Sequence, residues 1–177
     1  VELRKSASGH AAGDIGWDGR IVVTYINRQS VRRRLVEEDH DGLVRALEEL
    51  CARRGWELKN MKAERLSKEE QLAVVARTTF LVGVHGNGLT HLVMMPITPI
   101  STVIEIFYPT GFAHDYEWTS RALGIKHYAI WNDTSMSYPD SKLINSNYPE
   151  GFQGTQIPVY GPHVAKIIEE RADSQRR

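Results

Sequence analysis

Short apolar runs and segments of helical periodicity alternate along this chain, and that alternation limits the fold more than any other feature. The first run, Ile-Val-Val-Thr-Tyr-Ile at residues 21–26, is β-branched and almost uninterrupted, as in strands buried on both faces of a parallel sheet. Similar runs occupy residues 79–84, 102–107 and 126–131, and residues 56–61 are a plausible further strand. Helical spacing of apolar residues occurs between them, near residues 40–54, 67–77, 89–95 and 113–123. The pattern predicts an α/β fold with a Rossmann-like parallel sheet and helices on both faces.

The chain of 177 residues is long enough for one such domain, which we expect over residues 20–172. Residues 1–19 are rich in Gly and Ser and predict an N-terminal arm. Residues 132–160, rich in Asn, Ser, Pro, Gly and Tyr, predict a long loop. Pro162 suits the first turn of a closing helix over residues 161–172, and residues 173–177 are expected to form a tail.

The charge balance excludes some functions. With 22 Lys+Arg against 22 Asp+Glu, the chain has no broad positive field for nucleic acid or an anionic membrane. No run approaches the roughly 18 apolar residues of a membrane span, and the first residues lack the apolar core of a signal peptide. The single cysteine, Cys51, cannot form an internal disulfide, and we expect it to be a buried small hydrophobe.

Ligands of such sheets bind beyond the carboxyl ends of the strands. There the turn His85-Gly86-Asn87-Gly88 follows the third expected strand and precedes a short expected helix. Its two glycines permit a tight turn and a close approach of the backbone to a ligand. The helix amides and the His85 side chain suit a phosphate or a leaving group. The alternative is a glycine turn around a histidine that is satisfied within the fold. The spacing matches neither the dinucleotide fingerprint nor a Walker loop.

Arginines follow the first expected strand at Arg28 and at Arg32, Arg33 and Arg34. Guanidinium groups at a strand's carboxyl end can clamp a diphosphate through paired hydrogen bonds, although a solvated basic loop is an equal alternative. Glu105 lies within the apolar run at 102–107, where an unpaired charge is costly to bury. Its expected partner is either a ribose diol or a neighbouring arginine in a structural ion pair.

Asp39-His40-Asp41 has the D-x-D form that holds a metal ion in some enzymes. Because it precedes an expected helix, we interpret the two carboxylates as helix caps that complement the dipole. His85 and His91 are also spaced differently from a helical zinc pair. We therefore predict no metal site.

Together, four segments in this order resemble glycosyltransferase family 61, which includes EGF-domain O-GlcNAc transferases, protein O-mannose GlcNAc transferases and plant xylan glycosyltransferases. The resemblance covers roughly residues 20–133, and its strongest element is the His-Gly-x-Gly-Leu block. The segments are Arg28 with Arg32–Arg34, then Leu66-Ser67-Lys68-Glu69-Glu70-Gln71, Val82-Gly83-Val84-His85-Gly86-Asn87-Gly88-Leu89-Thr90-His91 and Val103-Ile104-Glu105-Ile106. The family often has Asn-Glu shortly after its arginine pair, whereas this chain has Val36-Glu37-Glu38, which leaves the register among the arginines open.

The resemblance implies a GT-B fold, of which this chain would be the C-terminal half that holds the nucleotide sugar. It implies an inverting transfer from a UDP-sugar, UDP-GlcNAc or UDP-xylose, to a protein or polysaccharide hydroxyl. It also implies a location in the lumen of the Golgi or the endoplasmic reticulum. We expect no tightly bound cofactor and no essential divalent metal. By motif match, the donor-binding residues are Arg28, Arg32, Arg33, His85, Gly86, Asn87, Gly88, Leu89 and Glu105, with His85 also the candidate catalytic group.

Two other functions remain open at this point. The chain can be a non-catalytic nucleotide-binding or interaction module that lacks the acceptor half of such an enzyme. It can also be a different α/β enzyme that uses His85 as a general base and binds no UDP. In the family reading, the base that activates the acceptor can belong to an N-terminal half.

Overall fold

The structure is a computed structural model that describes residues 19–174. Its centre is a six-stranded sheet in the order β2-β1-β3-β4-β5-β6. The first five strands are parallel and β6 runs antiparallel to β5. They are β1 (Val22–Ile26), β2 (Glu57–Met61), β3 (Phe80–Val84), β4 (Thr102–Ile106), β5 (Lys126–Trp131) and β6 (Thr134–Ser137). The predicted α/β fold with a mainly parallel sheet is confirmed.

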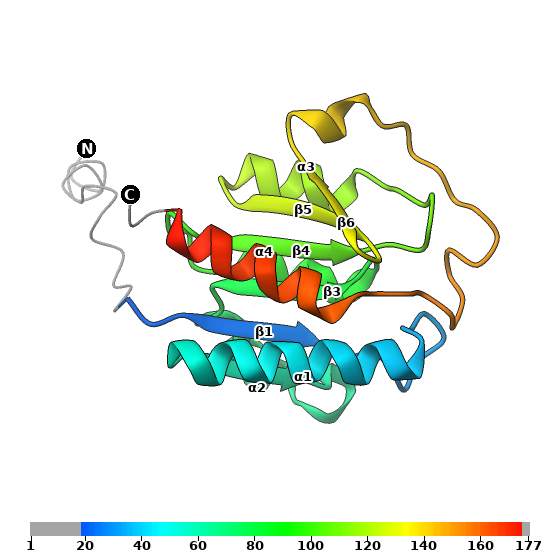
Figure 1. Cartoon of the computed structure of the whole chain (residues 1–177). Helices are drawn as coiled ribbons and strands as arrows, with labels where there is room; N and C mark the ends of the chain where they lie inside the picture. Colours follow the sequence, from blue (N-terminus) through cyan, green and yellow to red (C-terminus); the bar gives the residue numbers. More distant parts are fainter. Residues whose placement is uncertain (1–18, 175–177) are drawn as a thin grey trace.

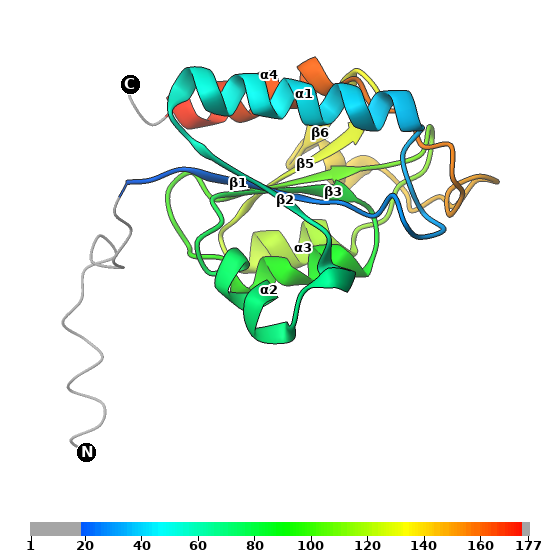
Figure 2. The same ribbon diagram turned by 90° about the horizontal axis from the view of Figure 1, so that it is seen from below.

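Helices cover both faces of the sheet and give the domain three layers (Figure 1, Figure 2). One face carries α1 (Glu37–Arg54) and α4 (Gly161–Asp173), and the other carries α2 (Lys68–Val75), α3 (Asp115–Ala122) and the 3₁₀ helix η3 (Asn87–Met94). Two short 3₁₀ segments, η2 (Ala63–Arg65) and η4 (Asp140–Leu143), lie in connections. Among the described residues, none of the helices combines the length and apolarity that crossing a membrane requires.

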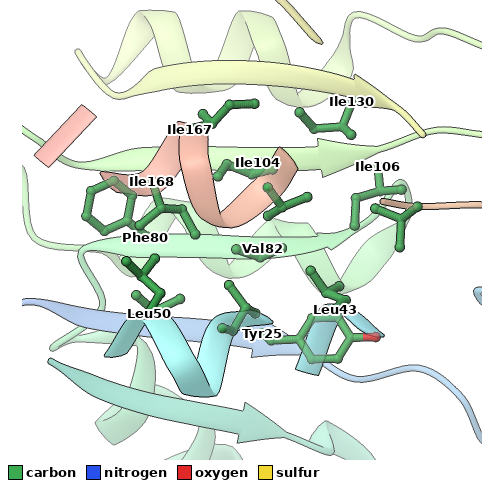
Figure 3. Close-up of a cluster of buried hydrophobic side chains, with 14 of the residues drawn as sticks. Tyr25, Leu43, Leu50, Phe80, Val82, Ile104, Ile106, Ile130, Ile167 and Ile168 are labelled. Atoms are coloured by element: carbon green, nitrogen blue, oxygen red, sulfur yellow. The ribbon is translucent and has the colours of Figure 1, made fainter. Parts of the chain in front are cut away.

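The larger apolar core lies between the sheet and the α1/α4 layer (Figure 3). Leu43 and Leu50 of α1 and Ile168 of α4 are almost completely buried. Burying one such side chain stabilises the fold by about 1.5–3 kcal/mol. They pack on Tyr25, Phe80, Val82, Ile104, Ile106 and Ile130 of the strands. A second layer of helices covers the opposite face, so the central strands β1, β3 and β4 are buried on both sides, as their sequences predict.

The start of α1 differs from the prediction. The helix begins at Glu37, and its N-cap residue, Val36, makes no side-chain capping bond. Asp39 therefore lies inside the first turn, where its Oδ2 accepts a hydrogen bond from the backbone N–H of Val159 at 3.0 Å. The predicted capping by Asp39 and Asp41 is wrong, because both residues follow the cap. The acidic first turn still complements the helix dipole.

The segment 132–160, predicted as a long loop, contains β6 and η4. A two-residue turn joins β5 to β6, in which Asn132 takes a left-handed backbone conformation with φ 51°. Thr134 closes the turn by donating its hydroxyl to the Trp131 carbonyl at 2.9 Å. Because β6 is a polar strand at the edge of the sheet, it lacks the apolar run that identifies the buried strands. The arm predicted for residues 1–19 lies outside the described residues except for Gly19, and so does the tail beyond residue 174.

The strand order creates one crevice at the carboxyl edge of the sheet. From β1 the chain passes through α1 to β2 at the edge, and then crosses back to place β3 on the other side of β1. The connections that leave β1 and β3 therefore diverge, and a switch point of this kind is where open α/β sheets bind their ligands.

Packing between α1 and α4 depends on a glycine. A Cβ at Gly161 would lie 2.6 Å from Leu43 Cα, whereas a Cβ at Gly42, in the same contact, would meet nothing within 4 Å. We predict that Gly161→Ala destabilises the domain by about 1–3 kcal/mol, because the helices must separate. The control Gly42→Ala should be neutral or stabilise by about 0.5–1 kcal/mol. Denaturant unfolding measures both, and equal stability of the two variants would contradict the close packing.

Candidate functional site

Two loops meet at the switch point, one after β1 and one after β3. Arg33 from the first loop donates through Nη1 to the carbonyl of His85 in the second, at 2.7 Å. Gly86 has a φ of 144°, and a Cβ on it would lie 2.5 Å from Arg28 Nη1 and 2.8 Å from Arg33 Nη1. Both guanidinium groups therefore lie directly against the Gly86 backbone, and only glycine leaves room for them.

The two guanidinium groups retain unused donors. Arg28 Nη1 and Arg33 Nε are buried and have no hydrogen-bond partner in the part of the chain that the structure describes. Burial, and after it the positive charge of Arg28, lowers the pKa of Arg33. Buried donors without partners are destabilising, and so are two adjacent positive charges. An anion bound at this point would relieve both effects.

The same two arginines line a pocket of about 310 Å³, together with Val31, Arg32, Asn87 and Gln153. Arg34 instead lines a separate pocket of about 510 Å³, beside residues of α1 that include His40 and Asp41. The structure thus separates the arginine run, with Arg32 and Arg33 on the side of Arg28.

His85 adjoins this pocket through its backbone carbonyl, which Arg33 holds, and the residue is only 9% exposed. Its Nδ1 lies 2.5 Å from Oε1 of Glu105. Three aromatic rings surround the imidazole: Phe107 stacks at 5.2 Å between centroids, Phe152 is tilted at 5.1 Å and Tyr116 points an edge at 5.7 Å. With the Glu105 carboxylate as acceptor, Nδ1 carries the hydrogen, an assignment made from the hydrogen-bond network. Nε2 then remains for another partner.

Glu105 is completely buried, and its other oxygen, Oε2, lies 2.7 Å from Nε2 of His127. Burial raises the pKa of Glu105 to about 7, against the opposing effect of the His85 hydrogen bond. Burial also lowers the pKa of His127 to about 4, so His127 is neutral at pH 7 and donates to the carboxylate. The sequence suggests a ribose or an arginine as the partner of Glu105. The structure instead gives its two oxygens to two histidines.

The other predicted residues of the glycine turn divide between pocket and core. Asn87 is exposed and lines the pocket. Leu89 is fully buried in the apolar cluster beneath the turn. A Cβ at Gly88 would lie 2.8 Å from Ile26 Cγ2, so this glycine is required by packing against β1. The predicted contacts of these residues with a donor remain predictions.

Comparison with known proteins shows the family of this chain. The family model described as Glycosyltransferase 61 matches residues 14–104, which include both loops of the candidate site. The chain belongs to glycosyltransferase family 61. The resemblance drawn from the sequence motifs is confirmed.

Among its relatives within the family are two proteins named EGF domain-specific O-linked N-acetylglucosamine transferase. The one from Drosophila melanogaster is 30% identical over 149 residues, which cover 84% of this chain and 26% of the relative. The one from Mus musculus is 31% identical over 127 residues, covering 71% of this chain and 22% of the relative. This family 61 chain therefore spans about a quarter of the length of the curated relatives that it matches.

Residues outside the family-model match complete the surroundings of His85. Glu105, His127 and Phe152 all lie beyond residue 104. His127 gives no signal in the sequence, because a lone histidine in a strand is ordinarily a core or surface residue. Phe152 lies in a segment without periodicity, between Gly151 and Gly154, and only its packing on His85 and beneath the Arg33 guanidinium reveals it.

We predict that His127 makes the stability of the domain depend on pH. Because its pKa is lower in the folded state than the ordinary value of 6.5, its contribution is present above pH 6.5 and lost as the pH falls through 4. Between these values the unfolding free energy of the wild type should fall by up to about 3 kcal/mol more than that of His127→Gln. Glu105 acts in the opposite direction, since its raised pKa favours the folded state below pH 4.5 and loses that effect through about pH 7.

Denaturant unfolding at pH 7 and at pH 4.5 measures the difference. The amide of His127→Gln can also donate to Glu105, so the difference between the two pH profiles reports the imidazole of His127. Parallel pH profiles for the two proteins would show that His127 is not held neutral by burial.

Proposed function

We propose that this chain is the donor-binding part of an inverting glycosyltransferase with a GT-B fold, which transfers a sugar from a UDP-sugar to a protein or polysaccharide hydroxyl. The observation that carries the proposal is the buried Arg28 Nη1, which has no partner among residues 19–174 and lies beside Arg33 against the backbone of Gly86. Membership of family 61 supports the class of reaction.

A nucleoside diphosphate fits the chemistry of this pocket. Its phosphate oxygens are anionic acceptors, and planar guanidinium groups give them paired, charge-assisted hydrogen bonds. Asn87 and Gln153 add amide groups at the rim. The pocket volume of about 310 Å³ is at the lower end of the roughly 300–1,000 Å³ typical of ligand sites. Because two arginines supply positive charge, we also propose that a divalent metal is not essential.

In an inverting transfer the acceptor oxygen bonds to the anomeric carbon as the bond from that carbon to the phosphate oxygen breaks. UDP leaves with the bonding electrons, so negative charge develops on its β-phosphate. We place Arg28 and Arg33 on this side of the reaction, where fixed donors stabilise the developing charge, and His85 beside them. The acceptor attacks from the opposite side of the anomeric carbon, so its proton goes to a base other than His85.

The printed names of the relatives support a narrower choice of substrates. They make UDP-GlcNAc our first choice of donor and a hydroxyl of an EGF domain our first choice of acceptor, with UDP-xylose as the alternative donor. We further propose that the enzyme works in the lumen of the endoplasmic reticulum or the Golgi.

Calorimetric titration of the chain with UDP, UDP-GlcNAc and UDP-xylose tests the binding proposal. Binding at micromolar to millimolar levels, unchanged by a metal chelator, is expected. The absence of UDP binding at millimolar concentration would refute a donor site. Donor hydrolysis or transfer would separate an enzyme from a nucleotide-binding module without activity.

Arg28→Ala gives the sharpest test of the diphosphate clamp. We predict that it weakens UDP binding by about 2 to 4 kcal/mol, as when one partner of a desolvated charged pair is removed. Arg28→Lys should recover only part of this loss, because an ammonium lacks the planar fork. Uridine has no phosphate and should bind all three proteins alike. If uridine binding falls as far as UDP binding, Arg28 supports the shape of the loop instead.

Gly86→Ala tests whether the close approach of the arginines matters. The new Cβ would displace both guanidinium groups, and we predict that UDP affinity falls about tenfold or more, since misplacing positioning groups by about 1 Å can reduce function up to about 100-fold. Gly124→Ala is the matched control: Gly124 also has positive φ (76°), but its Cβ would meet nothing within 4 Å. Equal UDP affinity in the two folded variants would show that the close approach of the arginines to Gly86 does not affect UDP binding.

A further inference from the structure

A buried polar cluster extends from His85 into the layer between the sheet and α3. Along β5 the side chains alternate, so that Tyr128 and Ile130 join the core under α4 while His127 faces the α3 side. On β4, Glu105 faces the same side, between Gly83 of β3 and Ala129 of β5 in register. The small neighbours at both positions leave room for the carboxylate to bond His85 and His127.

This arrangement is costly for a domain core. Glu105 is 0% exposed, His127 4% and His85 9%. Buried ionisable groups require partners, and apolar residues of similar size often give equal or greater stability. Two hydrogen bonds from opposite sides do, however, fix the plane of the carboxylate and through it the ring of His85. Stability alone therefore does not account for the cluster.

The hydrogen bond to Glu105 is the only one that the His127 side chain makes within the described residues, since its buried Nδ1 has no partner there. Glu117 of α3 is the nearest other carboxylate that acts on it, but both its oxygens have partners, His114 Nδ1 and Arg121 Nη1, each at 3.0 Å. The interaction of His127 is thus directed at Glu105.

Other charged groups act on this cluster from every side. Besides burial, Glu117 raises the pKa of His127, whereas His114 and Lys126 lower it. Asp115 raises the pKa of Glu105, and Arg33 lowers it. Tyr116 of α3 points its ring edge at His85. The test below therefore follows the protons of His85 itself and does not depend on the pH profile of the whole protein.

We propose that His127 is a positioning residue: through Glu105 it holds His85 as the Nδ1–H tautomer, which leaves the Nε2 lone pair to accept a hydrogen bond from a hydroxyl of the bound donor. The part of this inference that concerns the donor rests on the proposed function. The part that concerns the tautomer does not. A histidine whose other nitrogen is held by a carboxylate is oriented in this way at many metal and catalytic sites.

Two variants of His127 differ in one respect that matters. The amide nitrogen of His127→Gln can take the place of imidazole Nε2 and donate to Glu105, whereas His127→Phe fills the space and donates nothing. Should His127→Phe fail to fold, His127→Asn replaces it, because its shorter side chain retains an amide that falls short of Glu105.

Nitrogen-15 spectra of the imidazoles report the tautomer of His85, and titration with UDP by calorimetry reports affinity. We expect wild type and His127→Gln to show a single Nδ1–H tautomer of His85 and similar affinity. In His127→Phe the tautomers should mix and UDP affinity should fall by about tenfold or more, the range seen when the partner of a metal-binding histidine is removed.

An unchanged Nδ1–H tautomer in His127→Phe would overturn the proposal, whatever happens to affinity. So would mixed tautomers with no loss of UDP affinity, because His85 orientation would then not matter to the ligand. If the wild type binds no UDP, the proposed function fails, and the tautomer spectra still decide whether His127 positions His85.

Discussion

The crossing of the chain from β2 over β1 to β3 decides where every group of the candidate site lies. It brings the loop after β1 beside the turn after β3. The hydrogen bond from Arg33 to the His85 carbonyl joins these loops, although the two residues are 52 positions apart in the sequence. Right-handed crossovers on a parallel sheet leave few other places for these loops. The arginines and the glycine turn therefore form one pocket because of topology, before any side chain contributes specificity.

The described residues that line that pocket include three arginines and no carboxylate. Arg28 and Arg33 lie close together, and the nearest carboxylate that acts on Arg33, Glu105, is enclosed by His85 and His127. A direct ion pair between Glu105 and an arginine would occupy the donors that an anion needs. The two histidines hold the carboxylate in a second layer, so it offsets the positive charge without blocking the pocket.

The sequence predicts the strands of the sheet well, but it predicts poorly which side chains surround His85. Apolar runs identify the buried strands β1, β3 and β4, since burial on two faces leaves a local signal in each segment. The approach of Arg28 to Gly86 also follows from strand order and the glycine turn. Three features depend on contacts between distant segments. They are the hydrogen bond of Asp39 with Val159, the edge strand β6 and the partners of Glu105. His127 and Phe152 are distinguished only by where β5 and the 144–156 segment pack, which no local pattern encodes.

The two faces of the sheet differ in the groups that they bury: one is apolar and the other includes a polar cluster. The α1/α4 face is apolar from Tyr25 to Ile130, and its close contacts are between helix backbones and aliphatic side chains. The opposite face carries Glu105 and His127 beneath α3 and leads to His85 at the sheet's edge. Sites with no shared partners have nearly additive effects on stability. Substitutions under α4 should therefore change the free energy of unfolding without altering the tautomer of His85, whereas substitutions under α3 should alter that tautomer.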